Sequence, residues 1–171
     1  SSKEKIDKIW SFSKKFGGSL SDYTAWLLER SMKTLTVRFY EQQKNAKILS
    51  SFLKDSSAIK KVHYPGINDN EFYAIACKQM NGFGAVISFE LIKNINPKEF
   101  LTSLELINPS MSFAGVESTM LSPAETSHQL LTKEQRNEQG IVDNLIRFSV
   151  GIEDSEDLIE DINLAIHKCK K

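Results

Sequence analysis

The stretch over residues 143–157 constrains the fold of this 171-residue chain most strongly. Its apolar residues 145–150 predict a β-strand, Gly151 predicts a turn, and Asp154 predicts the N-cap of an acidic helix start. Arg147 interrupts the apolar strand, and a guanidinium group is costly to bury unless an anion meets it. Two interpretations stay open from these residues alone. Arg147 either faces solvent or pairs with a carboxylate of its own chain, or it receives the carboxylate of a substrate through a bidentate contact.

The spacing of apolar residues predicts helices first and a mixture of strands and helices afterwards. Helices are expected over residues 3–16, 22–31, 35–53, 70–80, 97–104, 132–140 and 155–169. Strands are expected over residues 59–64, 85–91, 106–107, 119–121 and 145–150. This order predicts an α/β fold whose mixed or antiparallel sheet carries helices on one face and follows long N-terminal helices. The polar run 41–47 within the third helix is assigned to a solvated face.

The composition excludes several classes of protein. The chain carries 22 basic and 22 acidic residues, which is not the electrostatic footprint of a nucleic-acid-binding protein. No apolar run is long enough to span a bilayer, and the first six residues lack the apolar core of a signal peptide. The two cysteines, Cys77 and Cys169, lack the spacing of metal ligands and indicate reduced thiols in a cytoplasmic protein. We therefore expect a cytoplasmic globular protein without a metal site.

Six motifs, in order along the chain, resemble the C-terminal part of the Cys/Met-metabolism PLP-dependent enzymes. This family includes cystathionine γ-synthase, the cystathionine β- and γ-lyases, methionine γ-lyase and O-acetylhomoserine sulfhydrylase. The motifs cover residues 17–38, 62–66, 80–90, 112–118, 123–128 and 143–157. Their order and spacing extend the resemblance over nearly the whole chain.

The resemblance implies fold type I of the PLP enzymes, in which a large domain binds the cofactor and a smaller C-terminal domain closes over the substrate. The matching region begins after the family's Schiff-base lysine, and no early lysine stands in a Ser-x-Thr-Lys setting. Residues 1–34 are therefore expected to be helices leading out of a missing large PLP-binding domain, and residues 35–171 the small domain. The cofactor lysine is expected to be absent, and with it any catalytic residue of this fragment.

The resemblance also assigns site residues. Arg147 falls on the arginine that holds the substrate α-carboxylate, and Ser112 falls on the serine of the family's Ser-Leu-Gly-Gly motif, unless it only forms a turn. Met111 replaces a glutamate of many γ-synthases and γ-lyases, so it either admits an apolar substrate side chain or simply packs. Glu117 and His128 match residues of an active-site loop. In the same motif Ala114 replaces the first glycine.

These assignments give a leading hypothesis and two alternatives. The parent enzyme would be a PLP-dependent carbon–sulfur lyase or transferase acting on cystathionine, homocysteine, methionine or O-acyl-homoserine, and would form a dimer or tetramer. The 171-residue chain alone is expected to be inactive. The alternatives are a non-catalytic assembly or dimerisation module, which would use the apolar first two helices, and one half of a split enzyme.

Overall fold

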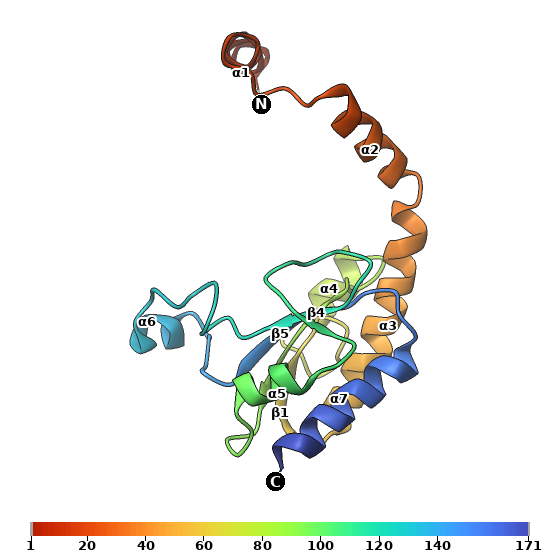
Figure 1. Ribbon diagram of the computed structural model, residues 1–171, viewed down its shortest axis with the longest axis vertical. Helices are drawn as coiled ribbons and strands as arrows, with labels where there is room; N and C mark the ends of the chain where they lie inside the picture. The colour runs from red at the N-terminus through yellow and green to blue at the C-terminus, as the bar shows by residue number, and fades with distance from the viewer. Residues whose placement is uncertain (1, 171) are drawn as a thin grey trace. The chain divides into compact units, whose positions relative to one another are not determined.

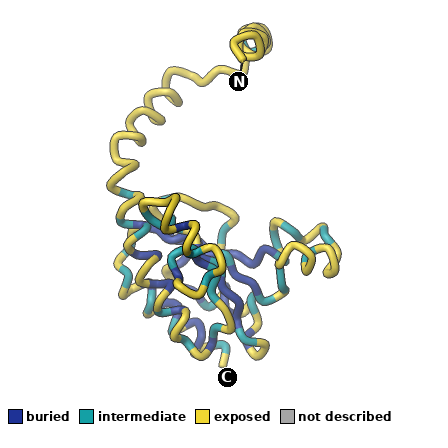
Figure 2. The backbone as a smooth tube through the Cα atoms, turned by 180° about the vertical axis from the view of Figure 1, so that it is seen from behind, coloured by how far each residue is buried: buried dark blue, intermediate teal, exposed yellow. Residues whose placement is uncertain are grey.

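The computed structural model describes residues 2–170 and divides the chain into two units, Ser1–Thr36 and Val37–Lys171. The first unit consists of α1 (Lys3–Phe16) and α2 (Asp22–Met32), joined through Gly17 and capped by Ser2 and Ser21. Neither helix buries a residue (Figure 2). Their aromatic residues Trp10, Phe16 and Trp26 are exposed. The predicted N-terminal helices are thus confirmed, whereas their assignment to the edge of a missing large domain stays a prediction.

The second unit is a five-stranded mixed sheet with helices (Figure 1). Its elements, in chain order, are α3 (Leu35–Asp55), β1 (Ile59–His63), α4 (Tyr73–Gln79), β2 (Val86–Leu91), α5 (Pro97–Ser103), β3 (Asn108–Pro109), β4 (Thr119–Leu121), α6 (Lys133–Glu138), β5 (Leu145–Ser149) and α7 (Ser155–Cys169). The strand order is β1-β2-β5-β4-β3, antiparallel except for the parallel pair β3 and β4. The prediction of a mixed sheet is confirmed.

The hydrophobic core lies between one face of this sheet and three helices. Because side chains alternate along a strand, β5 turns Ile146 and Phe148 into the core, and their neighbours on β2, Phe89 and Ile87, do the same. Buried residues of α3, α5 and α7 complete the core; they are Ala46, Leu49, Leu53, Phe100, Leu101, Leu158, Ile162, Ala165 and Ile166. Figure 1 shows α3 and α7 running along this side of the sheet. The predicted placement of helices on one face is confirmed.

Several helices begin at capping side chains, and the predicted N-cap Asp154 is among them. Asn96 caps α5, with Pro97 in its first turn, and Asp154 caps α7. Thr132 and Gln135 form the reciprocal hydrogen bonds of a capping box at the start of α6. No helix among residues 2–170 combines the length and the apolar character needed to cross a membrane.

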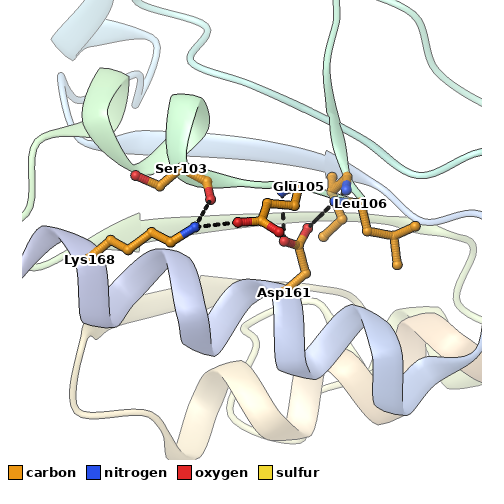
Figure 3. A network of polar contacts seen from close by, with 6 residues as sticks. Ser103, Glu105, Leu106, Asp161 and Lys168 are labelled. Atoms are coloured by element: carbon orange, nitrogen blue, oxygen red, sulfur yellow. Dashed lines mark hydrogen bonds and ion pairs between the residues drawn. The ribbon is translucent and has the colours of Figure 1, made fainter.

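The short strand predicted near residues 106–107 begins two residues later, at Asn108, because a buried carboxylate takes the backbone donors of the preceding residues. Asp161 of α7 accepts hydrogen bonds from the N–H groups of Glu105, Leu106 and Ile107 at 2.8, 3.1 and 2.9 Å (Figure 3). Strand pairing begins only at Asn108, which lies opposite Thr119. Lys168 lies seven residues after Asp161 on α7. It pairs with the Glu105 carboxylate at 2.6 Å, which ties the same segment to the helix.

Replacing Asp161 with alanine should therefore destabilise the fold. Three backbone donors would lose their acceptor, and one of them is buried, so we expect the free energy of unfolding to fall by about 2–4 kcal/mol. Urea unfolding followed by circular dichroism measures this. Glu160→Ala, which removes an exposed carboxylate from the neighbouring position, is the control and should change stability by less than about 0.5 kcal/mol. Equal effects of the two substitutions would contradict the role given to Asp161.

A second buried carboxylate, Glu90 of β2, lies on the sheet face away from the core. It pairs with Lys60 at 2.7 Å and with the Nε2 atom of His63 at 3.1 Å, both from the edge strand β1. Burial works to raise the pKa of Glu90, but the hydrogen bonds from Lys60 and His63 outweigh it, and the pKa lies below its ordinary value of 4.5. The carboxylate thus stabilises the folded state in its charged form.

The lowered pKa of Glu90 predicts a pH-dependent contribution to stability. This contribution is fully present above pH 4.5, the ordinary value, and is lost as the pH falls through the lower folded-state value. Because Lys60 is largely exposed, we expect Glu90→Gln to cost only about 1 kcal/mol at pH 7. Urea unfolding of both proteins between pH 3 and 7 should show the difference shrinking towards pH 3. A difference that stays constant over this range would contradict the assignment, and Glu138→Gln, on an exposed helix, serves as the control.

Candidate functional site

The candidate site lies where the loop over residues 110–118 meets strand β5. The Nη2 atom of Arg147 donates hydrogen bonds to the carbonyl oxygens of Met111 and Ser112, both at 3.1 Å. The guanidinium carbon lies 5.3 Å from the centre of the Phe113 ring, which is within the range of a cation–π contact. The structure thus brings together Arg147, Met111 and Ser112, the three residues predicted to bind substrate.

Strand alternation explains why Arg147 can reach this loop. Its neighbours Ile146 and Phe148 are buried in the core, so Arg147 projects from the opposite face of the sheet, between Ser88 of β2 and Leu121 of β4. The arginine is half-buried there, and burial lowers its pKa below the ordinary value of a guanidinium group. A guanidinium group nevertheless stays charged in proteins.

The charge of Arg147 has no anionic partner in the part of the chain that the structure describes. None of the ion pairs over residues 2–170 includes Arg147. Its Nε atom is buried and has no hydrogen-bond acceptor among these residues. The interpretation in which Arg147 pairs with a carboxylate of its own chain therefore finds no support here. The Nη2 atom of Arg147 thus donates to two neutral carbonyls, while its buried Nε–H has no acceptor among the described residues.

Ser112 and Met111 contribute in different ways. The carbonyl oxygen of Ser112 accepts from Arg147 and from the Thr119 hydroxyl, and its N–H group donates to the Ser110 hydroxyl at 3.2 Å. The Met111 side chain is 64% exposed, so among the described residues it does not pack into the core. It borders a cavity of about 140 Å³, whose lining includes Leu101, Pro109, Met120, Leu121 and Ser122. The substrate-binding roles of Ser112 and Met111 stay predictions.

Glu117 and His128, the two predicted loop residues, lie apart from these three. Glu117 is exposed, and its carboxylate lies over Gly115. His128 is half-buried; its Nδ1 atom lies 2.8 Å from the Ser127 hydroxyl, and its N–H group donates to the Pro123 carbonyl. Their active-site roles therefore stay predictions.

Ala114 holds an unusual backbone conformation within the site loop. Its φ angle is 62°, in the left-handed region that glycine adopts more readily, and its N–H group donates to the Ser149 hydroxyl at 2.9 Å. The glycine expected from the family motif would fit this position without strain. The loop keeps the conformation because Ser149 holds it.

Ala114→Gly should accordingly stabilise the folded chain. Relief of the left-handed strain is worth about 1 kcal/mol, partly offset by the greater freedom of glycine in the unfolded state. Urea unfolding should give a net gain of up to about 1 kcal/mol. Ala124→Gly, at a position without positive φ, is the control and should not stabilise the chain. A loss of stability in Ala114→Gly would contradict the strain assigned to this residue.

Four polar side chains that support the site were not predicted. Glu153 and Ser118 lie within two of the quoted motifs, so a role for them could have been inferred from the sequence. Gln42 and Asn45 belong to the run 41–47, whose assignment to a solvated face is wrong for these two residues, because both are buried. The amide of Asn45 reaches residues more than a hundred positions away, which no local pattern indicates.

The fold and this site define an α/β domain that carries an arginine without an anionic partner among the described residues, and comparison with known proteins gives its family. A family model described as "Cys/Met metabolism PLP-dependent enzyme" matches residues 1–167. The chain belongs to this family. The predicted family membership is confirmed.

The relatives include several cystathionine lyases, which are much longer than this chain. Cystathionine β-lyase of Lactococcus lactis subsp. cremoris (strain MG1363) is 41% identical over 167 residues, which are 98% of this chain and 44% of the relative. Cystathionine γ-lyase of Bacillus subtilis (strain 168) is 39% identical over 165 residues, again 44% of its length. The crystal structure of cystathionine γ-lyase from Lactobacillus plantarum complexed with L-serine superposes with a TM-score of 0.91 at 38% identity, covering 99% of this chain and 45% of that one. The chain therefore spans less than half the length of the relatives it matches.

The cavity beside Met111 does not by itself fit a PLP-binding site. A Schiff base needs a lysine amine and the cofactor phosphate needs several donors, yet neither a lysine nor an arginine lines the cavity beside Met111. A metal site is not indicated either, since residues 2–170 contain no cluster of three or more metal-ligating side chains. The site offers one cation, Arg147, without an anionic partner among the described residues.

Proposed function

We propose that this chain is the substrate-closing C-terminal portion of a PLP-dependent trans-sulfuration enzyme, and that Arg147 holds the α-carboxylate of the substrate. One observation carries the proposal. Arg147 is a half-buried cation without an anionic partner among the described residues, and its buried Nε atom lacks an acceptor. A carboxylate can accept from Nε and a terminal nitrogen together, in the bidentate geometry that arginine favours.

The residues of this chain would act by positioning rather than by proton transfer. A bidentate contact fixes both the place and the direction of an α-carboxylate, and so orients the bond at the α-carbon that is to be broken. The Met111 and Ser112 carbonyls both accept from Nη2 and so fix the position of the guanidinium. In this proposal the cofactor and its lysine belong to polypeptide outside residues 1–171, and the protein acts in the cytoplasm.

The substrate we propose is a sulfur-containing amino acid with an apolar side chain. Met111 stands where a distal ammonium group would find a glutamate in many relatives, and a thioether offers that ammonium no counter-charge. The cavity bordered by Met111 is lined by apolar side chains such as Leu101 and Met120, and by four polar residues that include Glu125. The preference for methionine or homocysteine over cystathionine therefore rests on Met111 and not on the cavity.

A second candidate function rests on the apolar surface of α1 and α2. Large hydrophobic side chains there, among them Ile9, Phe12 and Leu28, are more than half exposed. Surfaces of this kind mark interfaces. They fit a PLP-binding large domain, in the same chain or as the other half of a split enzyme, or a second copy in a dimer or tetramer. Light scattering after size-exclusion chromatography distinguishes self-association from a monomer, and mixing with an N-terminal family domain tests complementation.

The carboxylate role of Arg147 can be tested by ligand binding. We expect the chain to bind L-methionine but not L-methionine amide, since the amide lacks the negative charge. Arg147→Ala should weaken L-methionine binding about ten- to hundredfold, and Arg147→Lys should fall between, because lysine cannot make the bidentate contact. Dissociation constants come from NMR titration of backbone amides.

Arg136→Lys is the matched control, because it makes the same change in an arginine that already pairs with Asp143. Its affinity for L-methionine should equal that of the wild type. The proposal is wrong if L-methionine amide binds as tightly as L-methionine, or if Arg147→Ala leaves the affinity unchanged.

A further inference from the structure

Two amide side chains of α3 reach from the helix into the loops that form the candidate site. The Nε2 atom of Gln42 donates to the carbonyl oxygen of Gly115 at 2.6 Å. The Nδ2 atom of Asn45 donates to the carbonyl oxygens of Gly151 and Glu153, at 3.2 and 2.7 Å. Asn45 is only 1% exposed. Gln42 and Asn45 thus donate to three loop carbonyls, which is a structural role and not that of a solvated helix surface.

The two loops that these amides hold are also bonded to each other. The carboxylate of Glu153 accepts from the N–H and the hydroxyl of Ser118, at 2.6 and 2.9 Å. The Ser118 hydroxyl in turn accepts from the N–H of Gly151 at 2.8 Å. The Ile152 N–H donates to the Val116 carbonyl at 2.9 Å. The 115–118 and 151–153 segments therefore form one hydrogen-bonded unit, and side chains of α3 donate hydrogen bonds to both segments.

This unit is connected directly to Arg147. Gly115 lies three residues after Ser112, whose carbonyl oxygen accepts from the guanidinium. Gly151 follows β5, the strand that carries Arg147, by two residues. The chain thus runs from Arg147 to Gly151, and from Ser112 to Gly115. The carbonyl oxygens of both glycines accept hydrogen bonds from side chains of α3.

We propose that Gln42 and Asn45 are positioning residues of the carboxylate site, which fix the Met111–Ser112 carbonyls relative to Arg147. The inference rests on the proposed function, because it concerns the same site. Both amides act here as donors, so an acid of the same shape, which cannot donate when ionised, would repel the carbonyls that it faces. Loss of these contacts would leave Arg147 on its strand, but the Met111 and Ser112 carbonyls would no longer be held in place. The guanidinium would then lose its fixed orientation.

Isosteric substitutions test the inference in the full 171-residue chain. Gln42→Glu and Asn45→Asp remove the donors without changing the shape of the side chain. Gln43→Glu is the matched control on the same helix, because the Oε1 atom of Gln43 accepts from the Gly84 N–H and a carboxylate can still accept there. All variants are compared under conditions in which circular dichroism shows them fully folded.

Three readouts separate positioning from general destabilisation. Hydrogen exchange of residues 112–118 reports the loop without any ligand, the NMR resonance of the Arg147 Nε–H group reports the guanidinium, and titration with L-methionine reports binding. We expect about tenfold faster exchange of the loop, a displaced Arg147 resonance and at least threefold weaker L-methionine binding in Gln42→Glu and Asn45→Asp. Gln43→Glu should match the wild type in all three.

The outcomes distinguish the two claims. If Arg147→Ala abolishes binding while both α3 variants exchange and bind like the wild type, the positioning role is wrong and the proposed function stands. If the wild type does not bind L-methionine, the proposed function fails, and loop exchange and the Arg147 resonance still decide the positioning role. An equal response of Gln43→Glu would assign the effect to added charge and would overturn the inference.

Discussion

The close approach of two loops at Gly151 is the constraint on which the candidate site depends. A Cβ atom at this position would lie 2.6 Å from the Ser118 nitrogen, and nearer still to the Val116 carbonyl and the Glu153 carboxylate. Only glycine leaves room for these backbones to meet. Their contact fixes the end of β5 against the loop that follows Met111 and Ser112, and thereby sets the carbonyl oxygens that face Arg147.

The sheet supplies the second half of the arrangement. The register of β5 with β2 and β4 buries Ile146 and Phe148 against the helices, and the same alternation turns Arg147 to the opposite face. A shift of one residue would place the guanidinium in the hydrophobic core. The apolar residues of the strand therefore determine where the charge lies, and the loop determines what the charge meets.

Local chemistry made much of this fold predictable, and long-range contacts account for what was missed. Asn96, Thr132 and Asp154 cap their helices because their side chains act within three residues along the chain. The strand expected near residues 106–107 begins only at Asn108, because Asp161, more than fifty residues later, takes the backbone donors of Leu106 and Ile107. Spacing cannot indicate such a partner.

The site shows the same division. Arg147 attracted notice because a charge interrupts an apolar strand, and the resemblance supplied Met111 and Ser112 beside it. The buried amides of Gln42 and Asn45 stand in a polar run of α3 and therefore look like part of a solvated face in the sequence. Their partners, Gly115 and Gly151, contribute only backbone carbonyls, which leave no trace in a residue pattern.

A crystal structure with bound L-methionine tests the central claim most directly. The account predicts that the two carboxylate oxygens lie about 3 Å from Nε and a terminal nitrogen of Arg147, with the thioether beside Met111. The claim would be contradicted if L-methionine bound elsewhere while the Arg147 Nε atom stayed without an anion.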